Sequence, residues 1–302
     1  MKKKNILITG ARGFIGSNLS IYLNKKNFNI FGIGPKKLKT KNSNNSIYTK
    51  FINEKISYEN LYKNFKNVDF IIHCAGSGTT GFNLRYNYEK NYLTTKAIIN
   101  FCIKCKTKPY IIFMSSYSVY GFIKSKPASE NYNIKPFSSY AKTKKMSEDL
   151  LIKYNKSNNL KIKILRLSSI YGDGLKKQLL FDACKKISKN QSHFFGTGNE
   201  IRDWLHISDF TNLIYKILKN NFDSNQIINC GAGKGHKVKY VVESIKKQFN
   251  SKVLIKFTKK NITEPKNLLI NIKVAKSYRW KPKINLYKGI KQYVKWYKKN
   301  YD

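Results

Sequence analysis

Long hydrophobic runs and histidine are scarce in this chain of 302 residues. No stretch approaches the roughly 20 uninterrupted apolar residues that a membrane span needs, so we expect no membrane association. The start Met1–Lys4 leads into an apolar strand rather than into the hydrophobic region of a signal peptide. The four histidines are widely spread, with no pair at the spacing of metal ligands, so no metal site is expected.

Cysteine is also sparse, with five residues, an odd number. An odd set favours reduced thiols, and together with the N-terminal sequence it predicts a cytoplasmic protein. Cys102 and Cys105 form a C-x-x-C pair within a helical pattern, but no second pair lies nearby in the sequence. This favours buried thiols over a zinc site.

Acidic residues are few, because 16 Asp and Glu stand against 59 Lys and Arg and leave a net charge of +43. Such a charge would ordinarily suggest a nucleic-acid partner. Only five of these cations are arginine, however, and the lysines are scattered along the chain, which is typical of a compositional bias. We therefore expect no nucleic-acid partner and treat each arginine as informative.

The apolar residues, 41% of the chain, are enough for a buried core, and short apolar runs alternate with longer segments of helical period. This order predicts an α/β fold: a doubly wound parallel sheet (Rossmann fold) with a smaller C-terminal substrate-binding subdomain. We expect the dinucleotide-binding domain over residues 1–168 and about 205–232, and the subdomain over 169–204 and 233–302. The expected strands are Asn5–Thr9, Asn29–Ile33, Ile47–Phe51, Asp69–Cys74, Tyr110–Ser115 and Lys161–Leu167, and the expected helices are Phe14–Lys26, Ser57–Phe65, Asn83–Lys106 and Ser138–Asn155.

A glycine-rich loop joins the first expected strand to the first expected helix. A dinucleotide needs a tight turn at this place, close approach of the backbone to its pyrophosphate, and a helix N-terminus whose N–H groups attract phosphate. The loop residues expected to bind the cofactor are Gly10, Arg12, Gly13, Phe14, Ile15 and Gly16.

The second expected strand is not followed by the acidic residue that binds the ribose 2′-hydroxyl of NAD. Lys36 and Lys37 come after this strand instead, and Arg12 lies in the glycine loop. These cations could meet a 2′-phosphate. The sequence therefore favours NADP as the cofactor, with NAD as the alternative.

A tyrosine with a lysine one helical turn later is suited to proton transfer, because the ammonium favours the phenolate. Eight Tyr-x-x-x-Lys matches occur here, against roughly four expected by chance, so position must choose among them. Tyr140 and Lys144 begin a helix downstream of the fifth strand, whose end carries Ser116. Ligands of open α/β sheets bind outside the carboxyl ends of the strands, where Ser116 could meet Tyr140.

Together these motifs resemble the extended short-chain dehydrogenase/reductase family, in its NAD(P)-dependent nucleotide-sugar epimerase/dehydratase branch. The resemblance covers nearly the whole chain and implies a nucleotide-sugar substrate and a homodimer. It also implies that Asn91 has a structural rather than a chemical role. Beyond the glycine loop it rests on Asp69–Gly76, Ser115–Gly121, Tyr140 with Lys144, Arg166–Gly172, Gly196–Asp209 and Arg279–Pro282.

The resemblance assigns roles to individual residues. It implies that Ser116, Tyr140 and Lys144 form a catalytic triad and that Arg202 holds the diphosphate of the substrate. The full set of residues expected from the family in addition to the glycine loop is Ala75, Gly76, Tyr140 and Lys144 for the cofactor, and Ser116, Ser169 and Arg202 for the substrate.

The chain departs from the family pattern at three places. Tyr117 and Ser118 stand where sugar 4,6-dehydratases carry an Asp-Glu pair, and neither is a carboxylic acid, so dehydratase activity is not expected. Ser169 replaces an asparagine that commonly contacts the substrate. Near Glu264–Lys266, where a second arginine often binds the diphosphate, only lysines are available.

These expectations favour an NADP(H)-dependent oxidoreductase acting at C4 of a nucleotide-linked sugar, foremost a 4-keto-6-deoxysugar reductase. The first alternative is a nucleotide-sugar 4-epimerase with tightly held NAD, which would use the same residues. An alternative of another class is a catalytically silent protein that binds dinucleotide or RNA. The intact Ser116, Tyr140 and Lys144 argue against this last alternative.

Overall fold

The computed structural model describes residues 3–35, 45–77, 83–124, 126–220, 226–258 and 265–302. Lys36 and Lys37, expected near the cofactor, and Glu264 lie outside the described residues. Among the described residues, no helix combines the length and the apolarity that crossing a bilayer requires.

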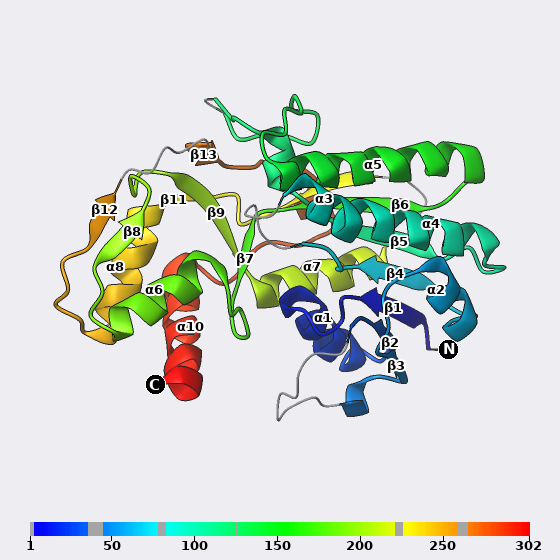
Figure 1. Cartoon of the computed structure of the whole chain (residues 1–302), viewed down its shortest axis with the longest axis horizontal. Helices are drawn as coiled ribbons and strands as arrows, with labels where there is room; N and C mark the ends of the chain where they lie inside the picture. Colours follow the sequence, from blue (N-terminus) through cyan, green and yellow to red (C-terminus); the bar gives the residue numbers. More distant parts are fainter. Residues whose placement is uncertain (1–2, 36–44, 78–82, 125, 221–225, 259–264) are drawn as a thin grey trace. The chain divides into compact units, whose positions relative to one another are not determined.

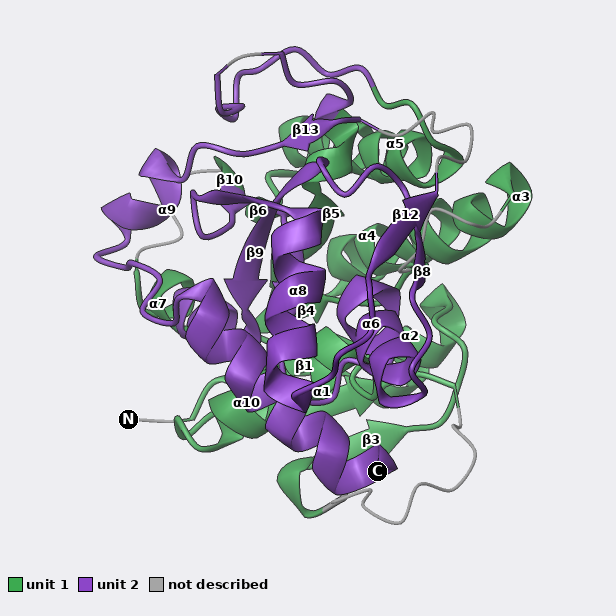
Figure 2. Ribbon diagram, turned by 90° about the vertical axis from the view of Figure 1, so that its left-hand side faces the viewer, with its two compact units in different colours: residues 1–119, 136–166, 214–228 green, residues 120–135, 167–213, 229–302 purple. Residues whose placement is uncertain are grey.

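The chain divides into two compact units, which Figure 2 distinguishes by colour. The division differs from the expected domains in residues 120–135, 167–168, 205–213 and 229–232, which belong to the second unit. The first unit comprises residues 1–119, 136–166 and 214–228, and the second comprises 120–135, 167–213 and 229–302.

A seven-stranded sheet organises the first unit (Figure 1). Its strands are β1 (Asn5–Thr9), β2 (Asn29–Ile33), β3 (Lys50–Ile52), β4 (Phe70–His73), β5 (Tyr110–Ser116), β6 (Ile162–Leu167) and β10 (Gln226–Cys230). They follow the order β10-β6-β5-β4-β1-β2-β3, and the pairs β1–β2, β1–β4, β2–β3 and β4–β5 are parallel. The chain thus winds outward from β1 to one edge, returns to β4 and continues to the other edge, which confirms the doubly wound Rossmann fold.

Helices cover both faces of this sheet, because its central strands are apolar on both faces. Leu7, Ile71 and Ile111 lie in register on neighbouring strands and share one core with α2, α4 and α5. Helices α1 and α7 cover the other face (Figure 1). There the rings of Tyr22 and Tyr215 pack edge to face, with their centroids 6.3 Å apart. These helices are α1 (Phe14–Asn24), α2 (Tyr58–Asn64), α4 (Thr94–Lys104), α5 (Ser139–Asn158) and α7 (Ile207–Lys219).

The helix expected over Asn83–Lys106 is interrupted. A short helix α3 (Leu84–Asn87) is followed by a π-helical segment η2 (Tyr88–Leu93) before α4 begins. The segment contains Asn91, a fully buried amide. π-Helical turns are uncommon and often mark functional sites. The sequence pattern did not reveal this π-helical segment, because the apolar spacing on either side of it is that of a regular helix.

The strand expected over Ile47–Phe51 begins later than predicted. Asn45–Ile47 form a 3₁₀ turn, η1, and β3 starts at Lys50. A second 3₁₀ turn, η3 (Tyr117–Tyr120), follows β5 directly.

The second unit has β9 (Ile201–His206) at the centre of a four-stranded sheet. This strand pairs antiparallel with β11 (Gly235–Lys237) and parallel with β13 (Asn267–Leu268) and β7 (Ser169–Tyr171). The remaining elements are α6 (Gln178–Ser188), α8 (Val238–Phe249), α9 (Lys273–Ser277), α10 (Leu286–Tyr301), and a two-stranded sheet of β8 (His193–Phe195) with β12 (Lys256–Thr258).

Candidate active site

The glycine loop lies between β1 and α1, as the sequence predicts. Gly10 has a φ of +63°, and a Cβ added there would lie 2.9 Å from the backbone of Ala75. A Cβ on Gly16 would lie 2.3 Å from the carbonyl oxygen of Gly10. Gly13 is the N-cap of α1 and offers no side-chain cap, so backbone N–H groups at this helix end suit an anionic ligand. These features fit the pyrophosphate of a dinucleotide.

Arg12 is held against β3. Its guanidinium carbon lies 4.0 Å from the centroid of the Phe51 ring, and Nη1 donates to Oδ1 of Asn53. Phe14 and Ile15, the other expected cofactor residues of this loop, begin α1 and are half-buried. The contacts with Phe51 and Asn53 therefore fix the position of the Arg12 side chain.

A chain of hydrogen bonds runs from the end of β1 to η2 through His73. Thr95 Oγ1 donates to the Asn91 carbonyl over 2.7 Å and lies 3.1 Å from Nε2 of His73. Nδ1 of His73 lies 2.8 Å from Thr9 Oγ1, which in turn accepts from Ala75 N. The hydroxyl proton of Thr95 is donated to the Asn91 carbonyl, so Thr95 Oγ1 can only accept a hydrogen bond from His73. We therefore assign the His73 proton to Nε2. Burial and the nearby Lys144 lower the pKa of His73 to about 3, so the ring is neutral.

Tyr140 and Lys144 lie in the first turns of α5. This helix starts here because the Ser138 side chain caps it, accepting from Ala141 N over 3.1 Å. Ser116 at the end of β5 acts on the Tyr140 hydroxyl and lowers its pKa, so the structure brings together two residues that the sequence only placed at the same edge.

Lys144 is almost fully buried beside this pair. Its Nζ donates to the Met114 carbonyl over 2.8 Å and lies 5.9 Å from the centroid of the Tyr140 ring. A Cβ added to Gly76 would lie 3.2 Å from Nζ and 2.5 Å from Oδ1 of Asn91. The turn after β4, with Ala75 and Gly76, therefore contacts both the glycine loop and the buried lysine.

Burial shifts both titrating groups. It lowers the pKa of Lys144 to about 8, against the opposing charges of Cys74 and Glu148. Burial also raises the pKa of Tyr140 to about 12, although its hydrogen bond with Ser116 acts in the other direction. At neutral pH the lysine is therefore mostly an ammonium and the tyrosine a phenol.

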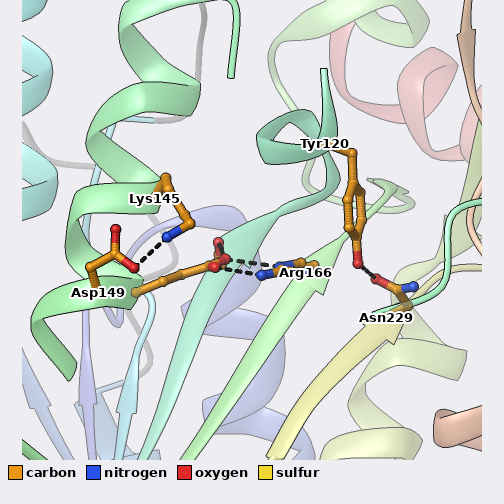
Figure 3. A network of polar contacts seen from close by, with 7 residues as sticks. Tyr120, Lys145, Asp149, Arg166 and Asn229 are labelled. Atoms are coloured by element: carbon orange, nitrogen blue, oxygen red, sulfur yellow. Dashed lines mark hydrogen bonds and ion pairs between the residues drawn. The ribbon is translucent and has the colours of Figure 1, made fainter. Parts of the chain in front are cut away.

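Glu148 is a member of this site that the sequence analysis missed. It lies one turn beyond Lys144 on α5, and its buried carboxylate accepts from Arg166 Nη2 over 2.8 Å and from Nε over 3.1 Å. Ser115 Oγ also donates to it. Figure 3 shows Arg166 of this ion pair near the more exposed pair of Lys145 and Asp149. The spacing of Tyr140, Lys144 and Glu148, four residues apart, was the signal that could have revealed it.

In the second unit the loop Gly231–Gly233 binds a carboxylate of the chain itself. Asp203 on β9 accepts from Ala232 N over 2.6 Å and from Gly233 N over 2.8 Å. A Cβ on Gly231 would lie 2.6 Å from Oδ2 of Asp203. This segment, which follows β10, is therefore occupied by a carboxylate of the chain.

Arg202 lies on β9 next to Asp203 and is half-buried. Its Nη1 donates to the Ile201 carbonyl over 3.0 Å. Asp209 accepts from the backbone N–H groups of Lys283 and Ile284. Ser169 lies on β7, where it pairs with Trp204 of β9. Both expected substrate residues therefore lie on strands of one sheet.

The model of the NAD dependent epimerase/dehydratase family matches residues 6–231. The chain belongs to this family. Its resemblance to nucleotide-sugar epimerases and dehydratases of the extended short-chain dehydrogenase/reductase type is thereby confirmed.

Relatives of this epimerase/dehydratase family member cover almost its whole length. A protein of Methanocaldococcus jannaschii named putative UDP-glucose 4-epimerase is 31% identical over 306 residues, which cover 98% of this chain and 99% of the relative. The UDP-glucuronic acid 4-epimerase from Bacillus cereus, solved with UDP-glucuronic acid and NAD, is 26% identical with a TM-score of 0.88, covering 98% of this chain and 100% of the other. The UDP-glucose 4-epimerase of Thermotoga maritima, at 21% identity and a TM-score of 0.90 over 99% and 100% of the two chains, shares the fold.

Proposed function

We propose that this protein is a nucleotide-sugar 4-epimerase that inverts C4 of a sugar linked to UDP, with NAD as a hydride carrier that is regenerated in each turnover. The observation that carries this proposal is the grouping of Tyr140, Ser116 and the buried Lys144 beside the Ala75–Gly76 turn. The sequence favoured a 4-keto-6-deoxysugar reductase. The epimerase alternative fits better, because the relatives compared above carry the names of 4-epimerases.

Tyr140 would move the proton in both half-reactions. As a phenolate it would accept the proton of the C4 hydroxyl, and as a phenol it would return that proton to the C4 oxygen. Ser116 would hydrogen-bond at this oxygen, and the Lys144 ammonium would favour the phenolate through its charge. The chemistry that a nicotinamide dinucleotide supplies here is reversible hydride transfer at C4.

The glycine loop would hold the pyrophosphate of the cofactor, at Gly10, Gly13 and the N-terminus of α1. We favour NAD, because Arg12 lies over Phe51 and donates to Asn53, and because the Bacillus cereus relative was solved with NAD. NADP is the second candidate. The observation in its favour is that Gly34 and Pro35, rather than a carboxylate, follow β2.

Arg202 would bind the diphosphate of the nucleotide-sugar, with Ser169 as a further substrate contact. A guanidinium can donate two parallel hydrogen bonds to phosphate oxygens, which lysine cannot do.

The test is incubation of the purified protein with a panel of UDP-linked sugars, followed by NMR of the products. We expect the 4-epimer of at least one sugar to appear, and dinucleotide to be released when the purified protein is denatured. A protein that releases no dinucleotide, and that reduces a 4-keto nucleotide-sugar only with added NADPH, would favour the reductase instead.

A further inference from the structure

The hydroxyl of Ser118 contacts the serine of the proposed catalytic triad. Ser118 lies in η3, two residues after Ser116, and the two side chains are only 6% and 7% exposed. The backbone N–H of Ser118 donates to Ser116 Oγ over 3.2 Å, and its hydroxyl donates to the same oxygen over 2.9 Å. One oxygen therefore accepts two hydrogen bonds from a single residue.

These two bonds determine what Ser116 can offer to Tyr140. A serine oxygen has two lone pairs and one proton, and Ser118 occupies both lone pairs. The proton of Ser116 then remains for the hydroxyl of Tyr140, and Ser116 does lower the pKa of that hydroxyl. A hydroxyl that donates to the tyrosine oxygen stabilises the phenolate, whereas one that accepts from it stabilises the phenol.

We propose that Ser118 is a positioning residue for proton transfer, which fixes Ser116 as a hydrogen-bond donor toward the Tyr140 oxygen. This inference rests on the role proposed above for Tyr140. Ser116 and Ser118 keep their protons throughout, and the proton of the sugar hydroxyl moves to Tyr140 and back.

Other groups also act on Tyr140, and all of them stay in place when Ser118 is changed. Tyr117 on η3 raises the pKa of Tyr140. Lys144 lies on α5, the helix that also carries Tyr140, with its Nζ 5.9 Å from the centroid of the Tyr140 ring. Behind Lys144 lie His73 and Cys74 at the end of β4 and Glu148 on α5. A change in the titration of Tyr140 after substitution of Ser118 alone therefore reports on Ser116 and Ser118.

The kinetic test uses Ser118→Val and Ser118→Thr, a pair of equal shape that differs in the hydroxyl. We expect Ser118→Val to lower kcat about tenfold, the worth of roughly one hydrogen bond. KM for the nucleotide-sugar should stay unchanged, and the rising limb of kcat against pH should move to higher pH. Ser118→Thr should restore kcat and the position of the rising limb to near the wild-type values. Equal kcat values and pH profiles in the two variants would overturn the proposal.

A control is Ser147→Ala, which removes a fully buried hydroxyl on α5. That hydroxyl donates to the Thr143 carbonyl over 2.9 Å. We expect kcat and its pH profile to stay at the wild-type values in this variant. A loss as large as that of Ser118→Val would assign both effects to packing and overturn the positioning role.

A second measurement does not depend on epimerase activity. NMR of protein labelled at tyrosine Cζ, with Tyr140→Phe used for assignment, gives the pKa of Tyr140 directly. We expect this pKa to rise by about one unit in Ser118→Val and to return in Ser118→Thr. An unchanged pKa would overturn the proposal even if the epimerase assignment holds, and a raised pKa in a protein without epimerase activity would support it independently.

Discussion

Each unit buries a carboxylate, and the two are stabilised in different ways. Glu148 in the first unit accepts two hydrogen bonds from the guanidinium of Arg166, whereas Asp203 in the second accepts from the backbone N–H groups of Ala232 and Gly233. A guanidinium supplies a full opposite charge, but N–H groups supply only dipoles. Burial therefore raises the pKa of Asp203 to about 7. The first unit therefore has a fixed ion pair, Glu148 with Arg166, beside the proposed proton-transfer site. The second unit has a carboxyl group, Asp203, that titrates near neutrality.

The largest effect is expected for a substitution of Tyr140, which tests whether the chemistry depends on the first unit. Tyr140→Phe should lower kcat by about 10²–10⁴-fold, because it removes the hydroxyl that carries the proton. Dinucleotide affinity should stay within about twofold, since the ring remains. The measurement is epimer formation together with a dinucleotide titration. Full activity in Tyr140→Phe, with loss in a variant of another Tyr-x-x-x-Lys match such as Tyr92→Phe, would show that the wrong tyrosine was chosen.

The fixed ion pair is tested by Glu148→Gln. Removal of one partner of a buried pair leaves the other charge uncompensated, so the free energy of unfolding should fall by about 3–5 kcal/mol. Asp149→Asn is the matched control, because the Asp149 side chain is 57% exposed in its pair with Lys145. Its cost should stay below about 1 kcal/mol. Similar losses in the two variants, measured by urea unfolding, would contradict the contrast.

The titrating carboxyl predicts a pH dependence of stability. The pKa of Asp203 is about 7 in the folded protein against 3.8 for an ordinary aspartate, so between these values the folded state binds a proton that the unfolded chain has lost. Stability from this group is complete below about pH 4 and falls as pH rises toward 7. The difference in unfolding free energy between wild type and Asp203→Asn should therefore change steadily across this window. A difference independent of pH would show that backbone N–H groups suffice to hold the carboxylate ionised.

A smaller effect is expected at Arg202, beside Asp203. Arg202→Lys should raise KM for the nucleotide-sugar about tenfold, because lysine cannot donate two parallel bonds to a diphosphate. Dinucleotide affinity and the melting temperature should stay near the wild-type values. A variant that melts several degrees lower but keeps its KM would assign Arg202 to the fold.

The smallest effect is expected at Arg12. Since its guanidinium lies on Phe51 and donates to Asn53, Arg12→Ala should change the ratio of NAD to NADP affinity by less than about threefold. Calorimetry with both cofactors measures this ratio. A wild-type preference for NADP of about tenfold that disappears in Arg12→Ala would instead support a 2′-phosphate contact.

The sequence predicted the features that depend on neighbouring residues. The apolar runs predicted the strands and the doubly wound order, and the position of Tyr140 after a strand end separated it from seven other matches. The π-helical segment around Asn91 was not predicted, because its spacing resembles that of an α-helix on either side. The roles proposed for Ser118 and Glu148 were not predicted, because they depend on which residues the fold brings against these side chains, namely Ser116 and Arg166.

The central claim is that Tyr140 and its neighbours invert C4 without net oxidation or reduction. The most direct measurement is the ratio of product formed to dinucleotide consumed, with a UDP-linked sugar and a sub-stoichiometric amount of NAD. We predict many molecules of the 4-epimer per molecule of NAD, no accumulation of reduced or oxidised cofactor, and no product with Tyr140→Phe. Product that forms only in equal amount to NADPH oxidised would contradict the account and identify a reductase.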